Sequence, residues 1–270
     1  MNNRSNQSGY WDHAMYKILD NDILNEVVKF HQSCTTILHG YDVTPFNSDT
    51  YEWLSQVELT DIIPNYYESE ILLPEVKKVN HVGSKREFEL DYNIAPELLS
   101  EIMYLAFGRS EHGTSKRYPS GGGLYPVIPV LYLLEDNIIL HTAHKKGTYI
   151  YDYEKNSLKQ IKAWDDREAQ KVLNFLNAGD IRKYSNYMIG YAIDIRRSVA
   201  KYKRRGYRHS LIEIGLMAQA FRETIVEVNH LQLGDFCWSG FDDHAFTYLS
   251  GLNPRTCPVT LVQWFGKVSN

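Results

Sequence analysis

Apolar residues between positions 208 and 229 recur with a period of 3.6 over a wide arc, which predicts a long, central and buried helix. The positions that carry this pattern are Leu211, Ile214, Met217, Ala218, Phe221, Ile225 and Val228. The same period predicts shorter helices over residues 21–33, 96–107 and 164–178. Asp20 is a suitable N-cap for the first of these, because its carboxylate can accept hydrogen bonds from the first helical turn.

Apolar runs bounded by turn residues predict strands. Five such runs are Val127–Leu134, Ile138–Thr142, Tyr149–Tyr153, Tyr187–Ile195 and Val259–Phe265. The segment Cys237–Phe246 predicts a loop, in which the neighbouring acids Asp242 and Asp243 suit a loop-to-helix cap.

Residues 40–80 hold several prolines and scattered aromatic residues without a sustained period, and this predicts an irregular arm. We therefore divide the chain into an N-terminal helix and arm, residues 1–80, and a main domain, residues 81–270. The arm is either a surface for a partner or peptide or a layer packed over the core. Packing over the core is the default expectation.

Composition limits the possible partners. The net charge of −4 argues against nucleic-acid or membrane attraction, and no apolar run approaches the roughly 20 residues that span a bilayer. No signal peptide is visible, and the three widely spaced cysteines predict reduced thiols in a cytoplasmic protein. His141 and His144 point to opposite faces of the predicted strand, so we expect no metal site there.

A glycine loop at residues 117–126 is the most distinctive candidate binding element. Three consecutive glycines lie between Pro119 and Pro126, so the backbone is open to a flat or charged ligand while the prolines limit its freedom. The loop precedes a predicted strand, whereas a Rossmann glycine loop follows one and opens a helix. The sequence also lacks a phosphate loop of the G-x-x-x-x-G-K-[ST] type. These two observations argue against a nicotinamide cofactor bound in a Rossmann domain.

Two basic segments are further candidates. Ser84, Lys85 and Arg86 could bind a phosphate, with arginine acting as a planar fork and lysine as a point charge. Residues 201–208 are either a solvated basic loop, which includes a phosphate or nucleic-acid patch, or the place of an active-site lysine. In the second case neighbouring positive charges favour a neutral Lys201 amine, and Tyr202 could share its proton.

Several of these segments together resemble the FMN-dependent nitroreductase superfamily. The segment Pro119–Pro126 is similar to its Pro-Ser-Gly-Gly motif. Other segments resemble the branch of this superfamily that oxidises azoline rings in ribosomally made peptides. They are the hairpin over 147–158, Lys201-Tyr202 with residues 204–208, the pattern Leu211-x-Glu213-x-Gly215-x-Met217 and the segments 255–256, 262–263 and 265–266. The resemblance covers essentially the whole chain and is thinnest over residues 40–80.

This resemblance implies an α+β fold with a central, mostly antiparallel sheet flanked by helices. It also implies an intertwined homodimer with FMN at the interface, a heterocyclised precursor peptide as substrate and a complex with cyclodehydratase subunits. The implied reaction converts thiazolines and oxazolines to thiazoles and oxazoles, with dioxygen reoxidising the cofactor.

The resemblance also implies roles for individual residues. Lys201 and Tyr202 would form the base pair that takes a proton while hydride passes to flavin N5. The implied cofactor-binding residues are Ser84, Arg86, Pro119, Ser120, Gly121, Gly122, Leu124, Ser239, Gly240 and Arg255. Gly83 stands where the family has an arginine, and Arg255 is the candidate replacement for that phosphate contact.

Two other functions remain open at this point. One is a flavin nitro- or quinone reductase that uses NAD(P)H, which would need an open flavin face and no lysine–tyrosine pair. The other is a non-catalytic subunit of a peptide-modifying complex, or an RNA-binding scaffold that uses the basic segment. A flavin absorbance band in the purified protein distinguishes the second from the enzymes.

Overall fold

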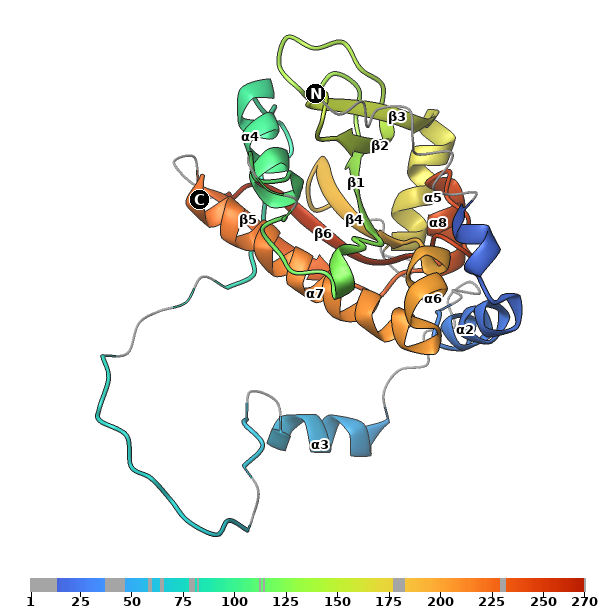
Figure 1. The fold of residues 1–270 in the computed structure, drawn as a ribbon. Helices are drawn as coiled ribbons and strands as arrows, with labels where there is room; N and C mark the ends of the chain where they lie inside the picture. Colours follow the sequence, from blue (N-terminus) through green and yellow to red (C-terminus); the bar gives the residue numbers. More distant parts are fainter. Residues whose placement is uncertain are drawn as a thin grey trace.

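The sheet that organises this molecule has six strands in the order β3-β2-β1-β4-β6-β5 (Figure 1), and each neighbouring pair is antiparallel. The computed structural model describes residues 14–36, 47–57, 60–63, 66–77, 81, 83–111, 113, 115–176, 183–228 and 232–269. The strands are β1 (Val127–Leu133), β2 (Gly147–Asp152), β3 (Ser157–Ala163), β4 (Tyr187–Ile193), β5 (Leu233–Trp238) and β6 (Val259–Lys267).

Helices cover both faces of this sheet. They are α2 (Asn21–Ser33), α3 (Ser48–Val57), α4 (Pro96–Phe107), α5 (Asp166–Leu176), α6 (Ile195–Tyr202), α7 (Arg204–Glu227) and α8 (Asp243–Leu249), with a 3-10 turn η1 at Gly121–Gly123. A short helical segment at 14–18 precedes α2. The expected α+β class with an antiparallel sheet between helices is confirmed.

Strand β4 lies at the centre, and its side chains alternate between two apolar cores. Tyr187, Ile189, Tyr191 and Ile193 pack on the side of α4 and α7, whereas Met188 and Ala192 pack on the side of α5 and α8. Every residue of the strand is buried, which explains why its sequence is almost continuously apolar.

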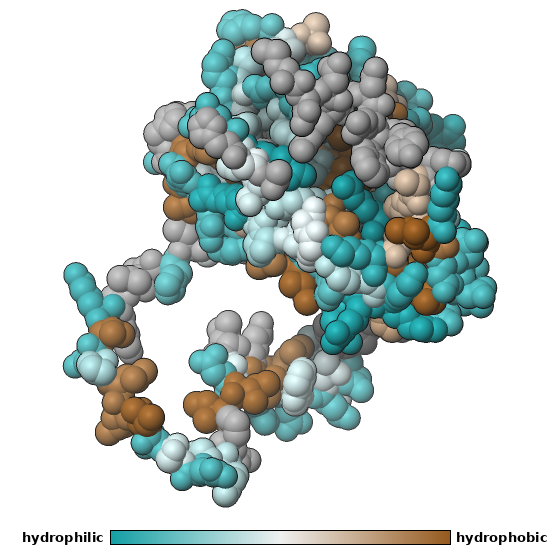
Figure 2. Space-filling view, viewed as in Figure 1, coloured by the Kyte–Doolittle hydropathy of each residue, from teal (hydrophilic) through white to brown (hydrophobic). Residues whose placement is uncertain are grey.

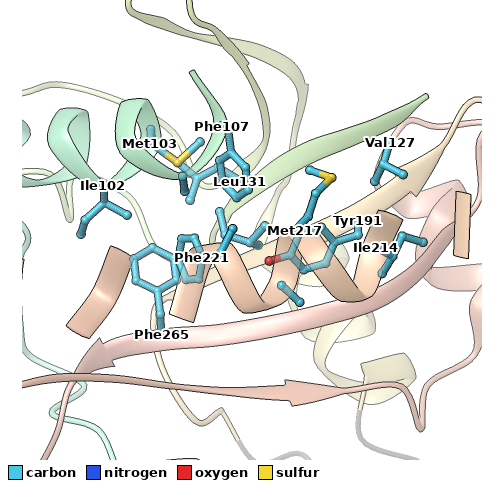
Figure 3. Close-up of a cluster of buried hydrophobic side chains, with 14 of the residues drawn as sticks. Ile102, Met103, Phe107, Val127, Leu131, Tyr191, Ile214, Met217, Phe221 and Phe265 are labelled. Atoms are coloured by element: carbon cyan, nitrogen blue, oxygen red, sulfur yellow. The ribbon is translucent and has the colours of Figure 1, made fainter. Parts of the chain in front are cut away.

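The core between α4, α7 and the sheet is fixed by aromatic rings (Figure 3). Phe107 of α4 stacks on Phe221 of α7 with ring centroids 5.7 Å apart, and Phe221 meets Phe265 of β6 edge to face at 5.2 Å. This contact explains the wide apolar arc of α7, because that helix packs on the sheet and on α4 at once. The predicted long, buried helix is therefore confirmed, and it begins four residues earlier than expected.

Several local predictions are wrong. Ile138–Thr142 is not a strand; Ile139 forms only an isolated bridge to Ile94, and His141 has a positive φ of 57°. The segment Cys237–Phe246 is not simply a loop, because it contains the end of β5 and the start of α8. Asp242 does cap α8 as expected, accepting a hydrogen bond from the Ala245 N–H at 2.8 Å.

The basic segment 201–208 is mostly helical rather than a loop. It contains the end of α6 and the start of α7, and the two helices meet at Lys203, whose φ is 53° and ψ is −140°. Asp194 caps α6 by accepting a hydrogen bond from the Arg197 N–H. The sharp change of direction at Lys203 places Lys201 and Tyr202 at a helix end.

The arm does not pack over the core in its described part. Figure 1 shows α3 and the following chain set apart from the sheet and its helices, and α3 buries none of its residues. Figure 2 shows hydrophobic side chains along this arm. Ile62, for example, is 98% exposed, and Ile71, Leu72 and Leu73 are also exposed. The expectation of packing over the chain's own core is therefore wrong for these residues, while the division at residue 80 stays a prediction.

Helix α2, in contrast, is anchored on α7 through a buried hydrogen bond. His31 is 3% exposed, and its Nδ1 lies 2.9 Å from the Tyr207 hydroxyl. Burial lowers the pKa of His31, because the charged imidazole loses its hydration.

This anchor predicts acid sensitivity. Since the pKa of folded His31 is below its unfolded value of about 6.5, its contribution to stability is present above that pH and is lost as the pH falls below it. We expect the free energy of unfolding in urea to decrease between pH 7.5 and pH 5.5, by at most about 1.4 kcal/mol from this residue, the limit set by the unfolded pKa. His31→Phe should reduce that slope, whereas Tyr207→Phe should lower stability and retain it. Identical slopes for the wild type and His31→Phe would refute the assignment.

Candidate functional site

The glycine loop lies along helix α7. Arg117 contacts the C-terminal part of the helix, where its guanidinium donates to Glu227 at 2.6 Å and to the Thr224 hydroxyl at 3.3 Å. At the other end of the loop, a Cβ atom at Gly121 would lie 3.3 Å from His209 Nδ1. The Ser120 hydroxyl accepts a hydrogen bond from the Tyr125 N–H at 2.8 Å and so closes the loop.

Lys201 and Tyr202 meet this loop at Gly122. A Cβ atom at Gly122 would lie 2.2 Å from the Tyr202 hydroxyl and 2.4 Å from Lys201 Nζ. Lys201 Nζ also donates to the Gly122 carbonyl at 3.5 Å and lies 5.1 Å from the centre of the Tyr202 ring. Gly122 and Lys201 are 79 positions apart in the sequence. The fold nevertheless brings the glycine loop and the end of α6 together in one site.

Glycine is required at this contact for two reasons. Gly122 has a φ of 63°, a conformation that side chains disfavour, and any side chain would collide with the lysine and tyrosine. Gly123 has a similar φ of 67° but nothing within 4 Å of its would-be Cβ. The loop therefore presents one glycine to the lysine–tyrosine pair and the next to open space.

His209 belongs to the same constellation, although no sequence motif indicated it. Its ring is edge-on to Tyr202, with centroids 4.8 Å apart. Its Nδ1 atom is buried and has no hydrogen-bond partner among the described residues. The helix turn between α6 and α7 brings His209 under the loop, which is a tertiary effect that spacing alone does not reveal.

Glu213 lies one helical turn further along α7 and is 2% exposed. Burial raises the pKa of its carboxyl group; hydrogen bonding from the Ser120 side chain and the Val127 backbone, together with the charge of Lys116, acts in the opposite direction. Its Oε1 atom has no hydrogen-bond partner in the described part of the chain. A buried carboxyl group therefore lies beneath the glycine loop and faces both of its ends.

The segment Ser84–Arg86 forms a separate cationic site. It lines a cavity of about 590 Å³ together with Glu87, Val268 and Ser269. The Arg86 guanidinium lies 5.8 Å from the centre of the Phe236 ring. Two hydroxyls and two cations in this lining are groups that suit a phosphate, and Glu87 adds one acidic side chain.

Arg222 is a second contributor to this site that the sequence did not reveal. It donates to the Ser84 hydroxyl at 3.2 Å and to Asp235 at 2.8 Å. Asp235 is 3% exposed and also accepts a hydrogen bond of 2.6 Å from Gln263. Arg222 lies off the apolar stripe of α7, and it links Ser84 to Asp235 of β5.

The remaining predicted site residues lie elsewhere in the chain. Lys85 donates its N–H to the Asp235 carbonyl at 2.9 Å, next to the start of β5, whereas Ser239 and Gly240 follow its other end. Arg255 is exposed and precedes β6, whose opposite end neighbours the Ser84–Arg86 segment. A strand of this length separates its two ends by about 25 Å at 3.3 Å per residue. One chain therefore does not bring Arg255 to Ser84 and Arg86.

Two residues of the loop have less defined surroundings. Pro119 is exposed, and Leu124 is half-buried at the end of η1.

In the described ranges, no group of three or more histidine, cysteine, aspartate or glutamate side chains could hold a metal ion. The three cysteines are free thiols. No helix among the described residues is long and apolar enough to cross a membrane.

Comparison with known proteins gives consistent matches. Residues 83–263 match the model of the nitroreductase family. The microcin B17-processing protein McbC from Escherichia coli is 28% identical over 175 residues, which span 64% of this chain and 62% of that protein. In sequence the match therefore covers less than two thirds of that relative's length.

Solved structures agree at the level of the fold. A chain of the E. coli microcin synthetase McbBCD complex with truncated pro-MccB17 bound superimposes with a TM-score of 0.81, at 21% identity, covering 95% of this chain and 97% of that one. A nitroreductase-type protein from Ralstonia eutropha has a TM-score of 0.54 at 17% identity, covering 78% and 97% of the respective chains.

The Arg222–Asp235 pair yields a stability prediction. Arg222→Ala should lower the free energy of unfolding by about 2 kcal/mol, because it leaves the buried Asp235 carboxylate with fewer partners. Asp235→Asn in the same chain should restore part of that loss by removing the unpaired charge. Urea unfolding of both single variants and the double variant measures the coupling. Strictly additive effects would contradict this account of the pair.

Proposed function

Because this chain belongs to the nitroreductase family, we propose that it is an FMN-dependent oxidoreductase that converts thiazoline and oxazoline rings of a precursor peptide to thiazoles and oxazoles. The observation that carries the proposal is the close contact of Lys201 and Tyr202 with the glycine loop at Gly122. A candidate base then lies next to Gly123, whose backbone is open to the approach of a flat ring system. The similarity to McbC supports the peptide substrate.

The residues present fit FMN. The cationic cavity at Ser84–Arg86 suits its phosphate, and the open backbone at Gly123 suits a planar ring. When bound, FMN would supply a two-electron acceptor that takes hydride at its N5 atom. Of the other predicted contacts, Gly121 and Gly122 remain candidates for the ring. Ser120 contributes through the shape of the loop, because its hydroxyl already accepts from Tyr125.

The chain's own residues have the proton chemistry that the reaction needs. Oxidation of an azoline removes a proton from the carbon that bears the peptide nitrogen and a hydride from the neighbouring ring carbon, and a ring double bond forms between them. We assign Lys201 as the base that takes the proton, with Tyr202 as its partner. The Gly122 carbonyl, 3.5 Å from Lys201 Nζ, orients the amine, and the exposed position of Lys201 leaves it accessible to a peptide.

Two features favour a site completed by a second copy of the chain. The Ser84–Arg86 cavity lies at one end of β6 and Arg255 before the other, so a flavin contacted by both groups needs two chains. The arm also exposes many apolar side chains that the described part of this chain does not cover. We therefore propose a homodimer, and a larger complex with cyclodehydratase subunits that resembles the McbBCD assembly.

A nicotinamide-dependent nitro- or quinone reductase is the second candidate. The presence of the Lys201–Tyr202 pair at Gly122 counts against it, because such a reductase would need an open flavin face and no such pair. A non-catalytic subunit is the third, and a flavin absorbance band in the purified protein would exclude it. Mass spectrometry of a heterocyclised peptide distinguishes the azoline dehydrogenase from both, because each oxidised ring loses two hydrogens, about 2 Da.

Lys201→Ala tests the base. We expect azoline oxidation to fall at least about a hundredfold, as for the loss of a general base, while the flavin absorbance is retained. Lys203→Ala is a matched control, since Lys203 is a neighbouring exposed lysine whose Nζ donates to the Ile18 carbonyl instead. Oxidation by Lys201→Ala at the rate of the control would remove Lys201 from the mechanism.

A pair of glycine variants tests the contact at Gly122. Gly122→Ala and Gly123→Ala both place a side chain at a positive φ, so their backbone costs are similar, about 1 kcal/mol. Only Gly122→Ala displaces Lys201 and Tyr202. We therefore expect a loss of turnover in Gly122→Ala that exceeds that of Gly123→Ala at least about tenfold, measured under saturating peptide with equal flavin content. Equal losses in the two variants would argue against a catalytic role for the contact.

A further inference from the structure

A cleft opens at Gly123, the glycine that follows the one in contact with the lysine–tyrosine pair. It has a volume of about 600 Å³ and is bounded by the C-terminal end of α4, by Gly123 and by the turn between β2 and β3. The side chains that contribute most of its wall are Tyr104, Arg109, Tyr153 and Glu154. This volume lies in the range of sites that bind drug-sized molecules.

Arg109 and Tyr153 of this wall belong to a cluster of cations and tyrosine rings that also includes Lys116 and Tyr125. The Arg109 guanidinium lies 4.7 Å from the centre of the Tyr125 ring and 5.6 Å from that of Tyr153. Lys116 Nζ lies 5.4 Å and 5.9 Å from the same two rings. Cations over ring faces are attracted by the π electrons, so the cluster holds Tyr125 of the loop and Tyr153 of the hairpin in a fixed relation.

The charges around the cleft select against an anionic ligand. Among the residues that line the cleft, Arg109 is positive, whereas Glu111 and Glu154 are negative. Lys116, which contacts the same tyrosine rings as Arg109, adds a second positive charge nearby. Burial, with the nearby charge of Arg109, lowers the pKa of Lys116 to about 8, which weakens the positive charge further at mildly alkaline pH. Flat polarizable surfaces with balanced charge suit a neutral planar ring, which can stack on a tyrosine or guanidinium face.

The cleft is also close to the candidate catalytic pair. Gly123 borders the cleft, and Gly122 is in contact with Lys201 and Tyr202. Consecutive Cα atoms are about 3.8 Å apart, so a peptide that presents a ring at Gly122 needs only a few residues to enter the cleft. Gly123 has nothing within 4 Å of its would-be Cβ, so the space directly beside this glycine is open.

We infer that this cleft binds the stretch of the peptide substrate next to the reacting ring and takes a neutral planar ring in that stretch, such as an azole already formed. The inference rests on the proposed function for the identity of the substrate. It assigns Tyr153 and Tyr104 as binding residues that contact the peptide outside the reacting ring.

Direct binding tests this assignment without catalysis. The probes are two fluorescently labelled synthetic peptides that contain one thiazole or an alanine in its place, titrated against the flavin-loaded protein and followed by anisotropy. We expect the wild type to prefer the thiazole peptide, and Tyr153→Ala to lower its affinity for that peptide roughly fivefold, the effect of about one aromatic contact. The alanine peptide should be affected much less.

Three further variants keep the test specific. Tyr153→Phe retains the ring and should bind like the wild type. Tyr104→Ala should weaken the thiazole peptide as Tyr153→Ala does. Tyr248→Ala removes a tyrosine of α8 that is 70% exposed and does not line the cleft, and it should have no effect. Thermal unfolding of each variant confirms that it is folded.

The assignment is overturned if the wild type shows no preference for the thiazole peptide, or if Tyr153→Ala weakens both peptides equally. These outcomes differ from a failure of the proposed function. In that case the wild type would not oxidise an azoline peptide in the mass-spectrometric assay, whatever its preference in binding.

Discussion

The contact between the Gly122 backbone and the side chains of Lys201 and Tyr202 is the constraint on which the candidate site depends. It needs a residue without a side chain, a positive φ, and two separate elements held in a fixed relative position. The register comes from the sheet. Strands β1 and β4 pair antiparallel, and just beyond them the Asp194 N–H donates to the Pro126 carbonyl at 2.9 Å. That hydrogen bond joins the end of the glycine loop to the start of α6, so the loop and the lysine–tyrosine helix are fixed to each other at their bases.

Helix α7 supplies the floor beneath this contact. Its apolar face packs against Phe107 and Phe265 through Phe221, and residues on another face of the helix contact the glycine loop. His209 and Glu213 lie beneath the loop on successive turns, and each has a buried polar atom without a hydrogen-bond partner among the described residues. Burying such atoms opposes folding by a few kcal/mol each. Their concentration under one loop is typical of a functional site, where stability is given up for a defined arrangement of charge.

The sequence was informative where a single element carries the signal. The periodic apolar face of α7, the cap at Asp20 and the glycine triplet are local patterns, and the predicted elements match the structure. It was misleading where tertiary contacts decide. The basic run 201–208 was compatible with a solvated loop, because its many charged residues show no apolar period that would indicate the end of α6 and the start of α7. Arg222 and His209 became visible only when the fold brought them to Asp235 and Tyr202. Sequence periodicity does not predict such tertiary contacts, because they depend on how elements that are distant in the sequence pack against each other.

The candidate cofactor-binding groups lie far apart within a single chain. The cationic cavity around Ser84 and Arg86 and the loop at Gly122 contact different ends of α7: Arg222 serves the first and His209 the second. Thirteen residues of helix separate these two side chains, about 20 Å at 1.5 Å per residue. Arg255 lies in yet another place, before β6. In the homodimer that we propose, a cofactor bound by all of these groups would lie where the two chains meet, and the exposed apolar residues of the arm would contact the second chain.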